Sequence, residues 1–208
     1  MPPKQTVEDI QLSKKLSWLL RHGAKTEGIP IQLDGYVSVS DLVKHSRYKC
    51  FSLEKLQAIV SADAKQRYTL RWNKDRGVHE IRANQGHSLS SVVDSEAAGL
   101  EKLTNPPLLA VHGTYYRHWE AIKAQGLSRM NRNHVHFASS DRTESTLSGF
   151  RGDCQILIYL DTGKVLSDGI PIYRSSNDVL LCPGVEGVID TSYFERVIDR
   201  RTGQPLAY

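Results

Sequence analysis

One stretch divides this 208-residue chain into two parts of different character, and it limits the fold more than any other feature. Residues 88–107 begin with a serine-rich run and end in Asn105-Pro106-Pro107, a composition typical of a linker. Helical patterns dominate before this stretch, and short apolar runs dominate after it. We therefore predict an α+β protein with two domains, residues 9–87 and 108–208, and a flexible N-terminus over residues 1–8.

Three helices and a β-hairpin are predicted for the first part. One apolar face defines a helix over residues 9–22, which Gly23 is expected to end; the residues of this face are Leu12, Leu16, Leu19 and Leu20. Two shorter helices are expected to follow, one with Ser40 as its N-cap and one that starts at Ser52. Strands near residues 68–72 and 78–83 then flank a turn at residues 75–77. This order is that of a winged helix-turn-helix, a module that usually binds nucleic acid.

The second part is predicted to be rich in short strands with little helix. Apolar runs bounded by Gly, Pro, Asn or Asp indicate strands at residues 108–111, 134–138, 155–161, 179–182 and 187–190. A single helix is expected over residues 117–124. Strands and helices do not alternate regularly, so the pattern argues against a doubly wound sheet. A compact α+β domain is expected instead.

Charge is distributed unequally between the two parts. Residues 1–86 hold 15 lysines and arginines against 9 aspartates and glutamates, a net charge of +6, whereas residues 87–208 have a net charge of −2. A basic first part suggests that it meets a polyanion. The alternative is a solvated lysine-rich surface, which charge alone does not exclude.

The sequence lacks the signature motifs of several function classes. The chain has no P-loop, no Gly-x-Gly-x-x-Gly after a strand and no Gly-x-Ser-x-Gly. It has no apolar run long enough for a membrane span and no apolar N-terminal signal, and its three widely spaced cysteines favour buried thiols over disulfides or zinc. His134 and His136 share a strand face without a carboxylate or thiol at ligand spacing, which favours pocket-lining or structural histidines over a metal site. We expect an intracellular protein without a metal.

Three arginines and a histidine stand in unusual positions. Arg21-His22 ends the first predicted helix, Arg67 begins the first hairpin strand, and Arg132 precedes a strand of the second part. Each has an ordinary explanation, as a cation at a helix C-terminus, a surface charge or a loop residue. Together they would suit a phosphate dianion, because guanidinium binds phosphate with two parallel hydrogen bonds and stays charged.

An ordered set of short motifs resembles the NAD-dependent RNA 2′-phosphotransferases, the tRNA-splicing enzymes of the KptA group. The similarity runs from about residue 9 to about residue 195. The matching stretches are Gln11-Leu12-Ser13-Lys14, Leu20-Arg21-His22, Asp34-Gly35-Tyr36, Lys65-Gln66-Arg67-Tyr68, Asn84-Gln85-Gly86-His87-Ser88, His112-Gly113-Thr114, Asn133-His134-Val135-His136, Ser148-Gly149-Phe150-Arg151, Asp168-Gly169-Ile170-Pro171 and Arg174-Ser175-Ser176-Asn177. Any one of these stretches is weak evidence, but the ordered set is specific.

The resemblance implies an N-terminal winged-helix lobe that binds RNA, a C-terminal lobe similar to ADP-ribosyltransferases, and NAD as co-substrate in the cleft between them. The implied reaction has two steps. The internal RNA 2′-phosphate attacks the NAD ribose and expels nicotinamide, and a ribose hydroxyl then attacks phosphorus. The products are a 2′-OH RNA and ADP-ribose 1″,2″-cyclic phosphate, and the expected substrate is spliced tRNA.

The resemblance also assigns site residues. By position, the catalytic set falls on Arg21, His22, Arg67 and Arg132, and the NAD-pocket histidine falls on His112. Thr114 is expected beside His112, and His136 either lines the same pocket or is structural. The remaining NAD-binding candidates in the matching motifs are Gly113, Ser148, Gly149 and Arg151.

Two alternatives remain open. The same pocket would serve an ADP-ribosyltransferase that stops after the first step and modifies phosphorylated nucleic-acid ends. A winged-helix nucleic-acid binding module with an inactive second domain is the other, although all four catalytic positions are occupied. We expect a monomer that acts in the cytoplasm or nucleus.

Overall fold

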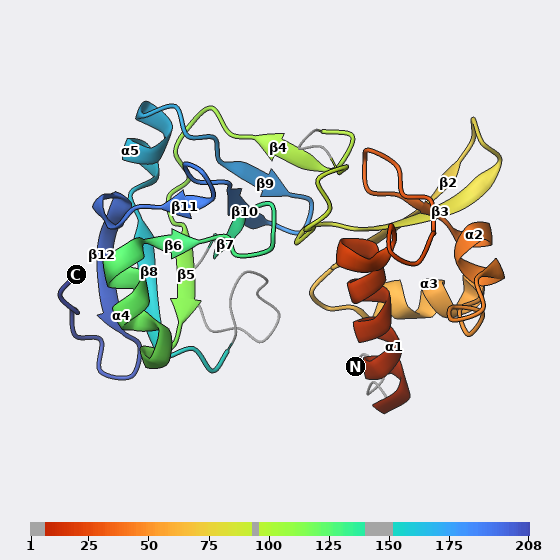
Figure 1. Cartoon of the computed structure of the whole chain (residues 1–208), viewed down its shortest axis with the longest axis horizontal. Helices are drawn as coiled ribbons and strands as arrows, with labels where there is room; N and C mark the ends of the chain where they lie inside the picture. The colour runs from red at the N-terminus through yellow and green to blue at the C-terminus, as the bar shows by residue number, and fades with distance from the viewer. Residues whose placement is uncertain (1–6, 93–95, 140–151) are drawn as a thin grey trace. The chain divides into compact units, whose positions relative to one another are not determined.

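The computed structural model describes residues 7–92, 96–139 and 152–208, which form two compact units, Met1–Gly99 and Leu100–Tyr208 (Figure 1). Among these described residues, the N-terminal unit has three α-helices and a three-stranded sheet, and the C-terminal unit has a seven-stranded sheet, a two-stranded sheet and two α-helices. This confirms the predicted α+β class. No helix of the described residues is long and apolar enough to cross a bilayer.

Helices and a hairpin follow one another in the N-terminal unit as the periodicity predicts. Its elements are α1 (Val7–Trp18), a π-helical turn (Leu19–Gly23), β1 (Val37–Ser38), α2 (Val39–Lys44), α3 (Leu53–Ala62), β2 (Tyr68–Asn73) and β3 (Val78–Ala83). The Ser52 side chain caps α3 by accepting a hydrogen bond from the Lys55 amide. The N-cap of α2 is Ser38 rather than Ser40, because β1 runs directly into this helix.

A single apolar core holds these elements together. The four leucines expected on one helix face are all buried in it, together with Leu42, Leu56 and Ile81. The helical segment ends at Gly23, as expected, and the chain then continues in a turn from Ala24. A Cβ atom at Gly23 would lie 2.3 Å from the Trp18 ring, so the glycine is required by close packing.

Glu80 of β3 is a fully buried carboxylate that joins the hairpin to the turn before β1. Its oxygens accept hydrogen bonds from Gln32, Arg71, Asn73 and Arg76. Burial alone would raise the pKa of Glu80, but these hydrogen bonds and the Arg71 charge hold it below its usual value. The carboxylate is therefore ionised at neutral pH and fixes the hairpin.

A seven-stranded sheet forms the centre of the C-terminal unit, in the order β12-β8-β5-β7-β10-β9-β4, and every pairing within it is antiparallel. Its strands are β4 (Leu100–Lys102), β5 (Val111–Thr114), β7 (Val135–Ala138), β8 (Ile156–Leu160), β9 (Tyr173–Ser175), β10 (Val179–Cys182) and β12 (Phe194–Asp199). The other elements are α4 (Tyr116–Gln125), α5 (Thr162–Ser167), a 3₁₀ turn (Thr191–Tyr193) and the short pair β6 (Leu127–Ser128) and β11 (Val188–Ile189).

Both faces of the central strands are covered, which explains their continuous apolar runs. In β8, Ile156, Ile158 and Leu160 enter the larger core, where Trp119 of α4 and Val165 of α5 also pack. The alternate residues Leu157 and Tyr159 join a smaller cluster on the opposite face. A strand buried on both faces has no polar alternation, so it reads as an unbroken apolar segment.

The structure also differs from the sequence-based expectations elsewhere. α5 is a second helix in the C-terminal unit, where a single helix was expected, and the strands β9 and β12 were not expected. Leu100–Lys102, expected within the linker, forms the edge strand β4 by pairing with β9. The strand expected at residues 108–111 instead runs from Val111 to Thr114, because its pairing partners on β8 are Tyr159 to Ile156. All three cysteines are free; Cys154 and Cys182 are buried as expected, but Cys50 is exposed.

Candidate active site

Arg21 and His22 lie in the π-helical turn that follows α1. The turn closes with a hydrogen bond from the Ala24 amide to the Leu19 carbonyl at 2.9 Å, one residue wider than an α-helical bond. Such wide turns occur mostly within α-helices and are frequent at functional sites. Leu19 and Leu20 are fully buried on one side of the turn, whereas Arg21 and His22 are half-buried. The turn thus presents both polar side chains from a rigid apolar base.

A segment after β3 contacts both of these residues. The Ser88 amide donates to the Arg21 carbonyl at 3.0 Å, and Ser88 Oγ lies 2.8 Å from His22 Nδ1. Gly86, at φ +90°, lies against the Arg21 side chain, since a Cβ atom there would be 3.3 Å from Arg21 Nε. A residue with a Cβ atom would be strained in this backbone conformation and would require the Arg21 side chain to shift by a few tenths of an ångström.

Arg67 is fixed by Asp63, the residue that follows α3. The Asp63 carboxylate accepts hydrogen bonds from the Arg67 amide at 2.5 Å and from Arg67 Nη1 at 2.6 Å. The Asp63 side chain is 4% exposed, while the Arg67 side chain is 34% exposed. One nitrogen of the guanidinium is thus anchored to a buried acceptor, and part of the group reaches solvent. The Asn84 amide also donates to the Arg67 carbonyl at 2.8 Å, so the segment after β3 reaches this arginine as well.

The C-terminal unit brings together three further expected residues. Arg132 is exposed in the loop before β7, and its Nη1 lies 3.5 Å from His136 Nδ1. The neighbouring strand β5 carries His112, whose Nδ1 lies 2.9 Å from the His136 carbonyl oxygen. The His112 ring also meets the edge of the Phe137 ring, with 5.9 Å between centroids. An arginine and two imidazoles therefore form one cluster on β5 and β7.

The environment of His112 favours its neutral form. Burial lowers its pKa below the usual value, and the nearby positive charge of Arg132 acts in the same direction, although the His136 carbonyl opposes both. His112 is therefore an uncharged imidazole at pH 7. Thr114 is buried at the end of the same strand, and Gly113 between them pairs with Leu157.

The remaining sequence-based candidates are not tested by this geometry. Ser148, Gly149 and Arg151 lie outside the described residues. Arg21, His22 and Arg67 belong to the N-terminal unit, and Arg132, His112, Gly113, Thr114 and His136 belong to the C-terminal unit. Within the described ranges, no three His, Cys, Asp or Glu side chains are grouped so that they could hold a metal ion.

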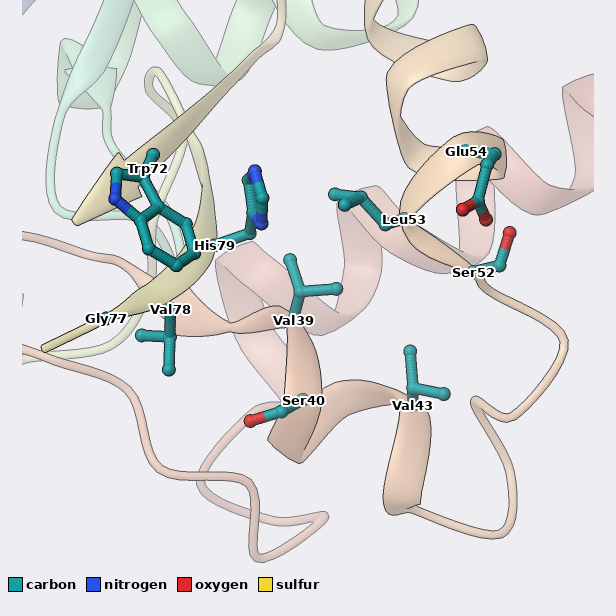
Figure 2. Close-up of a pocket in the computed structure, with 10 residues that line it drawn as sticks. All are labelled: Val39, Ser40, Val43, Ser52, Leu53, Glu54, Trp72, Gly77, Val78 and His79. Carbon is teal, nitrogen blue, oxygen red and sulfur yellow. The ribbon is translucent and has the colours of Figure 1, made fainter. Parts of the chain in front are cut away.

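A surface groove of about 440 Å³ lies elsewhere in the N-terminal unit. Figure 2 shows its lining from α2, the start of α3 and the hairpin: Val39, Ser40, Val43, Ser52, Leu53, Glu54, Trp72, Gly77, Val78 and His79. The Trp72 ring is stacked edge-on against His79, with 4.8 Å between centroids. None of the expected catalytic residues lines this groove.

Sequence reasoning missed the residues that hold the expected site residues in place. These are Asp63, Asn84, Gly86 and Ser88. The stretch Asn84–Ser88 matches a family motif, but the sequence offered no role for it. Asp63 had a weaker signal, an acidic residue four positions before an arginine at the end of a helix.

Comparison with known proteins gives a consistent assignment. Residues 7–184 match the model of the RNA 2′-phosphotransferase, Tpt1/KptA family. The chain is 40% identical over 208 residues to tRNA 2′-phosphotransferase 1 of Mus musculus, covering 99% of this chain and 83% of that protein. It is 41% identical over 191 residues to the Danio rerio protein of the same name, covering 90% of this chain and 84% of that one. It is 32% identical over 187 residues to tRNA 2′-phosphotransferase of Saccharomyces cerevisiae, covering 85% and 80%. The family match spans most of both units, and we conclude that the chain belongs to the RNA 2′-phosphotransferase, Tpt1/KptA family.

Proposed function

We propose that this protein transfers the internal 2′-phosphate of RNA, in the first place spliced tRNA, to NAD as co-substrate. The products are a 2′-OH RNA, ADP-ribose 1″,2″-cyclic phosphate and nicotinamide. Family membership and the names of the relatives support the phosphotransferase reaction on RNA. The observation that carries the proposal for this chain is that Arg21, His22, Arg67 and Arg132 are all present, with Arg67 anchored at one nitrogen and still partly exposed.

Guanidinium groups suit the phosphate chemistry of this reaction. The attack on phosphorus builds negative charge on its oxygens, and fixed cationic donors stabilise that charge most when they need no reorganisation. Arg67 meets this condition because a buried carboxylate holds it. Because arginines supply the positive charge, we expect activity to persist in the presence of a chelator.

The cluster on β5 and β7 suits a nicotinamide nucleotide. The exposed Arg132 guanidinium offers donors to a phosphate, and the neutral His112 imidazole does not repel a cationic nicotinamide ring. When bound, NAD supplies a ribose carbon from which nicotinamide departs as a neutral group. The protein then has to orient the two substrates more than to donate a proton.

The N-terminal unit supplies features expected of the RNA-binding part. Residues 1–86 have a net charge of +6, which favours a phosphate backbone. Its order of three helices and a hairpin is also that of winged-helix modules. We accordingly propose RNA binding by this unit and NAD binding by the C-terminal unit.

The test is incubation of the full chain with a 2′-phosphorylated RNA, with and without NAD, in the presence of EDTA. We expect NAD-dependent appearance of 2′-OH RNA and cyclic phosphate product. Accumulation of RNA carrying ADP-ribose without further turnover would support the ADP-ribosyltransferase instead. RNA binding without any product would support the non-catalytic module.

The proposed catalytic arginines are tested by separating the two steps. Removing one donor of this kind typically lowers the rate by roughly 10²–10³-fold. We expect Arg67→Ala and Arg132→Ala to slow the second step more than the first, so that RNA with ADP-ribose on its 2′-phosphate accumulates. Lysine at either position should restore activity only in part, because it lacks the two parallel donors of guanidinium. Equal slowing of both steps would contradict this division.

A further inference from the structure

The segment Asn84–Ser88 connects the two elements that carry the proposed catalytic residues of the N-terminal unit. At one end, the Asn84 amide donates to the Arg67 carbonyl at 2.8 Å, and Asn84 Nδ2 donates to the Gln66 carbonyl at 2.7 Å. At the other end, the Ser88 amide donates to the Arg21 carbonyl at 3.0 Å. The residues just before β2 and the π-helical turn are therefore joined to one short piece of backbone.

Ser88 makes a second contact that its backbone bond does not require. Its hydroxyl oxygen lies 2.8 Å from Nδ1 of His22, 66 positions earlier in the chain. We propose that Ser88 is a positioning residue, which holds the His22 imidazole in the orientation that the reaction needs. This inference rests on the proposed function, because it assumes that His22 acts on the substrate.

The local geometry explains why a serine hydroxyl can do this. The backbone bond to Arg21 fixes the Ser88 Cα, so the hydroxyl is delivered to one place beside the ring. Gly86 allows the backbone of this segment to run close to Arg21, the neighbour of His22. At φ +90° it has no Cβ atom that would press on the Arg21 side chain. An imidazole held at Nδ1 loses its freedom to rotate about χ1 and χ2, and this ordering then occurs on folding rather than during the reaction.

The contact is also consistent with either proton arrangement. A hydroxyl both donates and accepts, so it can pair with Nδ1 whether or not that nitrogen carries the proton. Ser88 therefore restrains the ring in the neutral form and in the imidazolium form. Alanine at this position removes the restraint and leaves the backbone bond to Arg21 intact.

The test compares Ser88→Ala with Ser90→Ala in the full chain. Ser90 is exposed two positions after Ser88, so its replacement is a matched control. Because a misplacement of about 1 Å can lower a rate by roughly 10²-fold, we expect Ser88→Ala to lower kcat about 10-fold. The KM for 2′-phosphorylated RNA and the melting temperature should stay close to those of Ser90→Ala. Ser88→Thr retains the hydroxyl and should recover most of the activity.

A second measurement reports on the ring without using activity. The ¹⁵N chemical shifts of the His22 side chain should change in Ser88→Ala and remain as in the parent in Ser90→Ala. If the shifts do not change, or if kcat is unaffected while the parent is active, the inference is wrong. A melting temperature that falls in Ser88→Ala, with lost activity that Ser88→Thr fails to restore, would show a structural role only. An inactive parent would overturn the proposed function and the inference together.

Discussion

Replacing Glu80 by glutamine is expected to lower the free energy of unfolding by about 3 kcal/mol at pH 7. The Glu80 side chain is 0% exposed, and its oxygens lie 2.7 Å from Gln32 Nε2, 2.9 Å from Arg71 Nη2, 3.0 Å from Asn73 Nδ2 and 2.7 Å from Arg76 Nη1. Glutamine has the same shape, but its NH₂ group would face N–H donors of these partners, with no acceptor for either.

The expected loss of stability depends on the burial of Glu80 and on the partial exposure of its arginine partners. Breaking a buried ion pair by removing one partner typically costs about 3–5 kcal/mol. The Arg71 and Arg76 side chains are 37% and 48% exposed, so water replaces part of what they lose. We therefore take the lower end of that range. For a chain of this length, 3 kcal/mol corresponds to a fall in melting temperature of about 6–12 °C.

The stabilising effect of Glu80 should depend on pH in a definite direction. The pKa of Glu80 is below its usual value in the folded protein, so its stabilising effect is complete above the unfolded pKa of about 4.3. That effect is lost as pH falls through the lower folded pKa. The difference between parent and Glu80→Gln should therefore shrink as pH falls below about 4.

Urea unfolding at several pH values, followed by circular dichroism, measures both effects. Glu101→Gln is the matched control, because Glu101 is exposed on the edge strand β4. A difference below about 1 kcal/mol at pH 7 would refute the reasoning, since a buried carboxylate with these partners cannot be that weakly coupled. A difference that stays constant down to pH 3 would also refute it.

Three further substitutions test the candidate site. Asp63→Ala should lower the single-turnover rate on 2′-phosphorylated RNA by roughly 10-fold, because Arg67 loses its anchor. Asp63→Asn keeps an acceptor oxygen and should retain more activity. Equal rates in the parent, Asp63→Ala and Asp63→Asn would contradict the anchoring role of Asp63. Gly86→Ala should lose about 1–2 kcal/mol of stability from its backbone conformation and also activity, because a Cβ atom would press on Arg21; Gly77→Ala, at φ +62° in open space, should lose stability alone. His112→Ala should weaken NAD binding in calorimetry, and unchanged affinity would refute the assignment.

Local pattern was sufficient for most of the secondary structure. The leucine periodicity of α1, the start of α3 near Ser52 and the hairpin turn are each read from residues close together in the chain. The same holds for β10, where the expected strand and the observed one coincide at Val179–Cys182. These elements follow from side-chain periodicity and capping, which act over a few residues.

The bounds of several strands in the C-terminal unit are determined by the strands with which they pair. β5 lies three residues later than its apolar run suggests, because its register is determined by β8 and not by its own sequence. β4 is short and has two exposed residues of three, so it carries no pattern until β9 pairs with it. Its assignment to a linker followed from that missing pattern.

The residues that hold the candidate site in place were decided by contacts across the chain. Ser88 reaches His22 over 66 positions, and His112 reaches the His136 carbonyl over 24. Asp63 is only four positions from Arg67, yet their contact depends on the turn at Gln66, whose φ is +46°. The sequence alone pointed to candidate residues for the chemistry, because charge and residue type are local properties. Their supporting partners appeared only in the folded chain, because hydrogen bonds depend on positions in space that spacing along the sequence does not specify.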